Sequence, residues 1–333
     1  MTRQRITVAG AGVIGLWQAL TLARRGFDVM LVDREMDPLA NSASRHAGAM
    51  LAPWVEAESA PDVVRDCGAD GLALWQEAFP GVVNNGSLVV AVARDQPDLV
   101  RFAKLTREHR TLDRAALAEL EPDLAQRFSS ALYFADEAHV ATVPALAFLL
   151  DACRDAGVDI HFGRALEDSD REALIVDCRG MGARHRLPDL RGVRGERILM
   201  QTPDVTFSRP IRLLHPRHPI YVVPWGEGRF VVGATMIESE DAGPVSARSA
   251  LELLGAAYTL HPAFGEAEIL EMCAGVRPAF PDNVPRAVVT VVDGSRSIMV
   301  NGAYRHGFLL APVLASAVAN YLENGALHPL LRV

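Results

Sequence analysis

Lysine is nearly absent from this sequence, because Lys104 is the only one among 333 residues. It lies in the polar, helix-forming segment PDLVRFAKLTREH, where a solvent-exposed side chain is expected. Enzymes that use pyridoxal phosphate attach it through the Schiff base of an active-site lysine. We therefore expect any amine chemistry of this chain to depend on a different cofactor.

Features that would indicate nucleic acid or membrane as a partner are also missing. The sequence has 33 Lys and Arg against 41 Asp and Glu, a formal net charge of −8, and no basic tract. No apolar run approaches the roughly 20 residues of a membrane-spanning helix. A glycine-rich turn begins as early as Gly10, which leaves no room for a secretory signal before it. We expect a cytoplasmic protein that binds neither nucleic acid nor membrane.

Recognisable metal-binding and disulfide patterns are lacking as well. The ten histidines form no H-E-x-x-H motif, and His215 and His218 lie in the proline-rich sequence HPRHP, which favours a loop. The four cysteines show no C-x-x-C spacing. The sequence therefore predicts no metal site, and no disulfide framework for the cysteines, which are Cys67, Cys153, Cys178 and Cys273.

The opening stretch RITVAGAGVIGLWQALTLARRGFDVMLVDRE, residues 5–35, has the pattern of a dinucleotide site. A G-x-G-x-x-G motif joins a buried strand to a helix. Gly10 permits the tight turn, Gly12 allows the backbone to approach a pyrophosphate, and Gly15 allows close helix–strand packing. The helix N-terminus favours phosphate, and Asp33 at the end of the second strand can accept hydrogen bonds from a ribose. This pattern alone does not separate NAD from FAD.

The arrangement of helices and strands predicts an α/β fold in two parts. Helix–strand alternation occurs at both ends of the chain, whereas the region from Val193 is rich in strands, with a hairpin signature at GEG. A parallel sheet interrupted by an antiparallel one explains this order better than two consecutive domains. The expected helices are 13–25, 62–79, 95–109, one opening at Pro144, and a long apolar one ending before Gly325.

Four further segments resemble one known family. They are SASRHAGAMLAP (42–53), YVVPWGEGRFVVGATM (221–236), AGVRPAFPDNVP (274–285) and NGAYRHGFLLAP (301–312). Together they resemble the glycine oxidase family of thiazole biosynthesis, within the D-amino-acid oxidase and sarcosine oxidase superfamily of FAD enzymes. The resemblance covers nearly the whole chain and keeps the order of the family's motifs. NAD-dependent dehydrogenases share only the opening stretch.

The resemblance implies a domain organisation and a set of cofactor contacts. A Rossmann-like FAD-binding domain would comprise 1–84, 138–194 and 286–333, and a mainly antiparallel substrate domain 85–137 and 195–285. This is the D-amino-acid oxidase, or glutathione-reductase-2-like, architecture. FAD would be bound without a covalent link, because covalent relatives use a cysteine near the position of Gly275. Besides the three glycines, the implied FAD contacts are Val13, Ile14, Asp33, Arg34, Ala43, Ser44, Gly48, Ala49, Met50, Leu166, Ala303, Tyr304, Arg305, His306, Gly307, Phe308 and Leu309.

The resemblance also implies a substrate site. Arg277 matches the arginine that binds the substrate carboxylate, and a guanidinium can pair with a carboxylate through two parallel hydrogen bonds. Tyr221, Met236 and Arg305 match residues that line the substrate pocket. Without the family pattern, Tyr221 could equally be a core tyrosine, Met236 a core filler, and Arg305 with His306 a solvated pair.

The expected reaction is the oxidation of glycine or a similar small amine to the imine. The imine would be hydrolysed to glyoxylate and ammonia or passed to thiazole synthesis, and O2 would be reduced to H2O2. We assign no catalytic acid or base, because positioning of the C–H bond can suffice for a neutral amine. A D-amino-acid or secondary-amine oxidase, a dehydrogenase that uses a carrier, and a flavin-stabilised binding protein remain alternatives. The sequence is compatible with a homo-oligomer and does not fix the oligomeric state.

Overall fold

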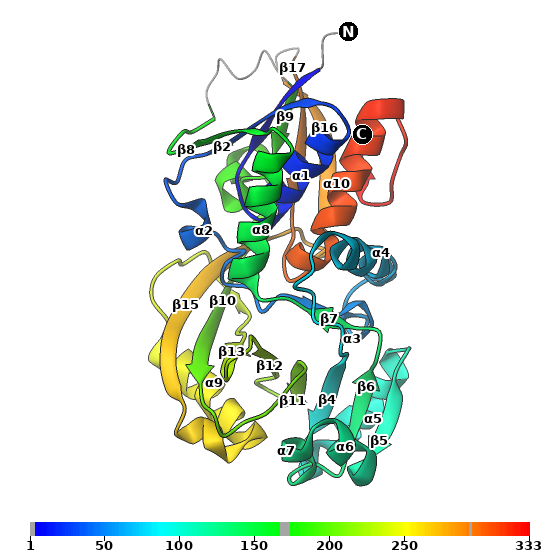
Figure 1. Cartoon of the computed structure of the whole chain (residues 1–333), viewed down its shortest axis with the longest axis vertical. Helices are drawn as coiled ribbons and strands as arrows, with labels where there is room; N and C mark the ends of the chain where they lie inside the picture. Colours follow the sequence, from blue (N-terminus) through cyan, green and yellow to red (C-terminus); the bar gives the residue numbers. More distant parts are fainter. Residues whose placement is uncertain (1–3, 167–173, 293–294) are drawn as a thin grey trace.

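The computed structural model describes residues 4–166, 174–292 and 295–333. Figure 1 shows two bodies stacked along the long axis, each built around its own sheet. Helices α1, α8, α4 and α10 lie in the body that holds both chain ends, and α5, α6, α7 and α9 lie in the other. Within the described residues, no helix is long and apolar enough to cross a membrane.

The first sheet has the order β18-β16-β17-β9-β1-β2-β8. Every pairing is parallel except that of β16 with β17. Strands of a parallel sheet are covered on both faces, which explains why every residue of β1 after the first, and every residue of β2 between its two ends, is buried. The strands are β1 (Arg5–Ala9), β2 (Asp28–Asp33), β8 (Asp159–Phe162), β9 (Leu174–Asp177), β16 (Arg286–Val292), β17 (Ser295–Asn301) and β18 (Leu331–Arg332).

The helices around this sheet share one apolar core with it. Leu16, Leu149 and Leu314 are among its buried members, one each from α1, α8 and α10. The long apolar helix is confirmed, and Gly325 follows it in the left-handed conformation that favours glycine. These helices are α1 (Val13–Arg24), α2 (Pro38–Asn41), α3 (Pro53–Glu56), α4 (Asp62–Ala78), α8 (Thr142–Asp155) and α10 (Gly307–Asn324).

The second sheet has the order β14-β10-β13-β12-β11-β4-β6-β5, with β15 also paired to β10. Its pairings are antiparallel except that of β11 with β4, so a mainly antiparallel second sheet is confirmed. The predicted hairpin is β12–β13. The strands are β4 (Ser87–Ala91), β5 (Arg110–Asp113), β6 (Ser130–Phe134), β10 (Arg191–Gln201), β11 (Ile211–Leu214), β12 (Ile220–Pro224), β13 (Arg229–Gly233), β14 (Ile237–Glu238) and β15 (Glu268–Ala279).

Some elements differ from the sequence prediction. The helix expected at 95–109 is shorter, because α5 (Gln96–Leu105) ends before strand β5 begins. The strand-rich region contains an unpredicted helix, α9 (Ala247–Leu260), whose first turn is capped by the Ser246 side chain. Further elements that were not predicted are α6 (Arg114–Leu120), α7 (Pro122–Ala125) and the small sheet of β3 (Met50–Leu51) with β7 (Ala138–His139). The domain boundaries remain a prediction.

Candidate active site

A cavity of about 750 Å³ is lined by residues of both sheets and of the segment that leads into helix α10. This volume lies within the range of roughly 300–1,000 Å³ that cofactor and ligand pockets occupy. The sequence-predicted residues that line it are Gly10, Gly12, Val13, Ile14, Asp33, Arg34, Ala43, Ser44, Gly48, Ala49, Met50, Leu166, Tyr221, Met236, Arg277 and 303–309. Gly15 does not line the cavity.

The tight turn between β1 and α1 requires glycines, because a Cβ atom would not fit at two of its positions. Gly10 has φ +98°, and a Cβ there would lie 2.8 Å from the Cys178 carbonyl oxygen. A Cβ on Gly15 would lie 1.7 Å from the Gly10 carbonyl oxygen, so Gly15 allows the helix to pack against the turn. The tight turn at Gly10 and the close packing at Gly15 therefore place the N-terminus of α1 at the cavity, which fits a bound pyrophosphate.

The carboxylate of Asp33 is held at the edge of this cradle by backbone donors. Its Oδ2 accepts a hydrogen bond of 2.7 Å from the Ala11 N–H, and its Oδ1 accepts one of 2.9 Å from the Glu35 N–H. Ser44 reaches the same turn from the segment 42–53, because its Oγ accepts a hydrogen bond of 3.0 Å from the Val13 N–H. The residues present therefore fit the ribose and pyrophosphate of FAD.

The segment before α10 closes the cavity from the other side. Tyr304 adopts φ +47°, which is uncommon for a residue with a side chain. Helix α4 approaches α10 so closely that a Cβ on Gly71 would lie 1.9 Å from the Leu309 carbonyl oxygen. Trp75 on α4 donates a hydrogen bond of 2.6 Å to the Phe308 carbonyl. These contacts fix the backbone of residues 303–309 beside the cradle.

Arg277 is a half-buried cation on the wall of the cavity. It lies on β15, and its guanidinium covers Gly195 of β10, where a Cβ would lie 2.1 Å from Nη2. Its Nη1 donates a hydrogen bond of 3.1 Å to the Thr235 carbonyl, and no described residue forms an ion pair with it. Burial and the nearby charge of Arg305 lower the pKa of Arg277 to about 10. A half-buried cation that lines a cavity and forms no ion pair with a described residue is suited to an anionic ligand.

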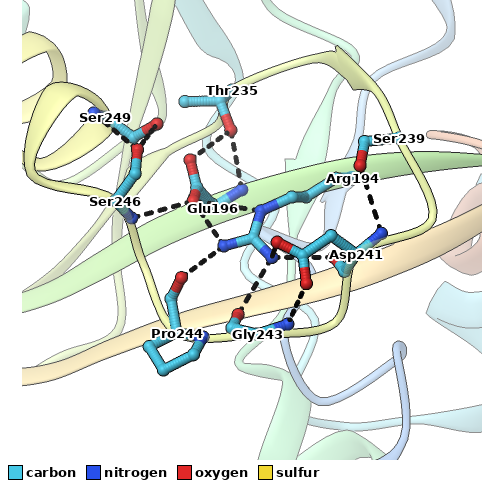
Figure 2. A network of polar contacts seen from close by, with 9 residues as sticks. All are labelled: Arg194, Glu196, Thr235, Ser239, Asp241, Gly243, Pro244, Ser246 and Ser249. Carbon is cyan, nitrogen blue, oxygen red and sulfur yellow. Dashed lines mark hydrogen bonds and ion pairs between the residues drawn. The ribbon is translucent and has the colours of Figure 1, made fainter.

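Figure 2 shows the network that holds the side chain of Thr235, the residue whose carbonyl accepts the hydrogen bond from Arg277. The Glu196 N–H donates to Thr235 Oγ1 at 2.9 Å, and Thr235 Oγ1 donates to Glu196 Oε2 at 3.2 Å. Arg194 is buried, forms an ion pair with Glu196, and donates to three backbone carbonyls, those of Asp241, Gly243 and Pro244. The buried centre of this network, Arg194 with Glu196, gives a rigid support for Thr235 and through it for Arg277.

A second charged cluster contains the predicted residues Tyr221 and Arg305. Arg305 Nη2 donates to both carboxylate oxygens of Glu56, at 2.8 and 3.0 Å, and to the Tyr221 hydroxyl at 2.7 Å. The Tyr221 hydroxyl in turn donates to Glu56 Oε1 at 3.1 Å. Met236 is half exposed, and its Sδ lies 3.5 Å from Arg305 Nη1. Arg305 and His306 are thus not a solvated pair.

Glu56 is a site residue that the sequence analysis missed. Burial opposes its ionisation, but the charges of Arg305, His306 and Arg212 lower its pKa to about 2. Burial lowers the pKa of His306 to about 4, although the Glu56 carboxylate opposes this shift. At neutral pH Glu56 is therefore an anion and His306 is neutral. No sequence signal links Glu56 to Arg305, because the two residues are 249 positions apart.

The short helix α3, which ends at Glu56, is anchored by a second buried carboxyl group. Glu137 Oε1 accepts hydrogen bonds from the N–H groups of Trp54 and Val55, at 3.0 and 2.7 Å. Glu137 Oε2 contacts the Ser87 hydroxyl. Burial raises the pKa of Glu137 to about 8, although these hydrogen bonds oppose the shift. Glu137 therefore fixes the helix from which Glu56 reaches the cavity.

Comparisons with known proteins agree with this geometry. A family model described as "DAO: FAD dependent oxidoreductase" matches residues 5–321. Over 319 residues, the chain is 51% identical to a protein named as the thiamine biosynthesis oxidoreductase ThiO of Rhizobium etli, and 96% of each chain is covered. It is 26% identical to the glycine oxidase of Geobacillus kaustophilus, over 97% of this chain and 93% of that protein.

A solved structure gives the same fold. The crystal structure of glycine oxidase from Geobacillus kaustophilus matches with a TM-score of 0.82 and 24% identity, and 97% of this chain and 96% of that chain are covered. This match confirms the predicted α/β fold with a parallel sheet. The family match and the identity to the Rhizobium etli protein together show that the chain belongs to the DAO family of FAD-dependent oxidoreductases.

Proposed function

We propose that this chain uses FAD to oxidise glycine or a similar small amino acid to its imine, with O2 as the electron acceptor, in thiamine biosynthesis. The family membership confirms FAD as the predicted cofactor. The names of the Rhizobium etli and Geobacillus kaustophilus relatives support the pathway and the substrate. A cytoplasmic location is part of the proposal.

The observation that carries the proposal is the half-buried guanidinium of Arg277, which lines the cavity and has no acidic partner among the described residues. A substrate carboxylate would supply the missing charge and form a bidentate pair. The Thr235 carbonyl and the close packing on Gly195 fix the orientation of the guanidinium. They would thereby fix the position of the substrate's α-carbon, which is the main contribution that such a site makes.

FAD, when bound, would supply the acceptor for the hydride that leaves the α-carbon with its two electrons. The cradle at Gly10 and Gly12 and the carboxylate of Asp33 would hold its ADP half, and residues 42–50 and 303–309 would enclose its ring. Glu56 is ionised and paired, and His306 is neutral, so neither changes protonation near pH 7. We therefore assign positioning, and no acid–base step, to the protein's own groups.

The test is the replacement of Arg277 by leucine in the holoenzyme. The loss of a charge-assisted pair should cost about 3 kcal/mol, or a hundredfold in apparent affinity for glycine. The measurement is the rate at which glycine bleaches the flavin under anaerobic conditions, with flavin content as a check. Arg277→Lys should recover only part of the affinity, since an ammonium lacks the planar fork.

Selectivity provides the control. In the leucine variant, the rate of flavin bleaching by an amine that lacks a carboxylate should fall much less than the rate with glycine. Such an amine makes no ion pair with Arg277. D-Alanine and sarcosine are tested beside glycine on the parent protein. They distinguish a glycine oxidase from a D-amino-acid oxidase and from a secondary-amine oxidase. Equal bleaching of the parent and the leucine variant by glycine would show that the carboxylate site lies elsewhere.

A further inference from the structure

The substrate end of the cavity contains more positive groups than one carboxylate requires. Arg212, Arg277 and Arg305 all line it. The side chains of Arg212 and Arg305 both lie against the ring of Tyr221, with Cζ atoms 5.4 and 5.9 Å from its centroid. Arg212 and Arg305 therefore lie together on Tyr221, and neither is needed for the carboxylate contact that is proposed for Arg277.

Two carboxylates neutralise this pair. Glu56 binds Arg305 through both oxygens, and Glu58 lies 3.2 Å from Arg212 Nη2. The neutralisation of Arg212 is incomplete, because its Nε and Nη1 are buried without a hydrogen-bond partner among the described residues. Arg305 is paired through one nitrogen, since Tyr221 and both oxygens of Glu56 take hydrogen bonds from its Nη2.

The cluster therefore has the composition of an anion site that is filled by the protein's own carboxylate. Glu56 lines the cavity itself, so it lies where a second acidic group of a ligand would have to approach Arg305. Like charges that face each other in a site commonly cost several kcal/mol, and such repulsion is a general means of excluding the wrong ligand.

We propose that Glu56 limits this site to substrates with a single carboxylate, because it occupies Arg305 and repels a second anionic group. This inference rests on the proposed function, in which Arg277 binds the first carboxylate. The excluded class comprises N-substituted glycines whose substituent ends in a carboxylate. Glu56 is thus a specificity-determining residue, and without its charge Arg305 and Arg212 become a second anion subsite.

The experiment compares two ligands that lack an amine and differ in charge, glycolate and diglycolate. Their dissociation constants are measured from the change in flavin absorption on titration of the holoenzyme, which requires no turnover. Glu56→Gln keeps the side-chain shape and an oxygen acceptor for Arg305, but removes the charge. We expect the preference for diglycolate over glycolate to rise about tenfold or more in this variant, equivalent to about 1.4 kcal/mol.

Controls separate this effect from a general change of charge. Glu35→Gln removes one negative charge from the opposite, dinucleotide end of the same cavity and should leave the ligand ratio unchanged. The double variant Glu56→Gln with Arg305→Gln removes the new subsite and should return the ratio to that of the parent. If Glu56→Gln retains no flavin, Glu56→Ala replaces it, because alanine also removes the charge and the ratio should still rise.

Two results would overturn the inference. An unchanged ratio in the charge-removing variant would show that Glu56 does not select against a second charge. Weaker glycine binding without a gain for diglycolate would instead indicate that Glu56 binds the substrate ammonium. Failure of the underlying function has a separate signature, namely that Arg277→Leu leaves glycolate binding intact, and that result would overturn both proposals.

Discussion

The two ends of the cavity are built in different ways. At the dinucleotide end, the shape comes from backbone atoms and from glycines such as Gly10 and Gly15, at which a Cβ would collide with a backbone carbonyl. At the substrate end, the shape comes from charged side chains, and Arg305 meets Glu56 from a position far away in the chain. The shape of the dinucleotide end depends on the absence of side chains at these glycines. The shape of the substrate end depends on which charged side chains are paired.

This difference predicts different responses to substitution. A backbone carbonyl cannot move away from an added methyl group without a change in the fold, whereas the end of an arginine side chain can. Added volume should therefore abolish cofactor binding at one end and only misplace a charge at the other. The following predictions test this contrast, in order of decreasing effect.

The largest effect is expected for Gly15→Ala. The new Cβ would lie 1.7 Å from the Gly10 carbonyl oxygen, so α1 must move away from the turn. We expect FAD affinity to fall at least about a hundredfold, which corresponds to roughly 2.7 kcal/mol. Flavin content after gel filtration measures this. Gly255→Ala on α9 is the matched control, because a Cβ there meets nothing within 4 Å. Normal flavin content in the Gly15 variant would contradict the prediction.

A smaller and more selective effect is expected for Gly195→Ala. The new Cβ would lie 2.1–2.3 Å from the guanidinium atoms of Arg277, which can swing away. We expect the fold and flavin content to be kept while glycolate binds some tenfold or more weakly, since the charged fork is displaced. Titration of the flavin spectrum with glycolate provides the measurement. The contrast between the two ends would be lost if this variant also released FAD.

Asp33→Ala should weaken FAD binding about tenfold, because a charge-assisted hydrogen bond contributes roughly 1.5–3 kcal/mol. The melting temperature of the holoenzyme should fall, while turnover at saturating FAD is largely retained. Asp33→Asn keeps an acceptor for the Ala11 N–H and should lose less. If FAD affinity is unchanged in the alanine variant, Asp33 is not the residue that binds the ribose.

The smallest effect concerns pH and Glu137. Burial raises its pKa to about 8, so between pH 4.5 and 8 the folded state keeps a proton that the unfolded state has lost. Stability from this carboxyl group is complete below pH 4.5 and is lost as the pH rises through about 8. Glu137→Gln mimics the protonated form and does not titrate. Relative to the parent, it should gain about 1.4 kcal/mol of unfolding free energy between pH 6 and pH 7, which is the value for one proton over one pH unit.

Denaturant unfolding of the holoenzyme at the two pH values measures this gain. Glu137→Ala serves as the control, because it leaves the N–H groups of Trp54 and Val55 without an acceptor and should be destabilised at both. A pH-independent difference between the parent and the glutamine variant would mean that Glu137 is ionised at neutral pH in the folded protein.

The same contrast explains what the sequence could predict. The turn at Gly10, the buried strands around it and the helix ended by Gly325 follow from local steric requirements, which a short stretch of sequence expresses. Arg277 was found only through the resemblance to a family. Glu56 and Glu137 were missed, because their roles arise from contacts with residues more than 80 positions away. Helix α9 carried a local signal at Ser246, but the surrounding strands obscured it.

The strand order of the first sheet has a consequence for folding of the chain during translation. Strand β9 lies between β1, from the start of the chain, and β17, which ends at Asn301. A nascent chain therefore exposes one edge of β9 until residue 301 has left the ribosome, and an exposed edge can pair wrongly. The second sheet ends at Ala279 and can close earlier. In the proposed site, FAD would consequently be enclosed only at the end of synthesis, when residues 303–309 become available.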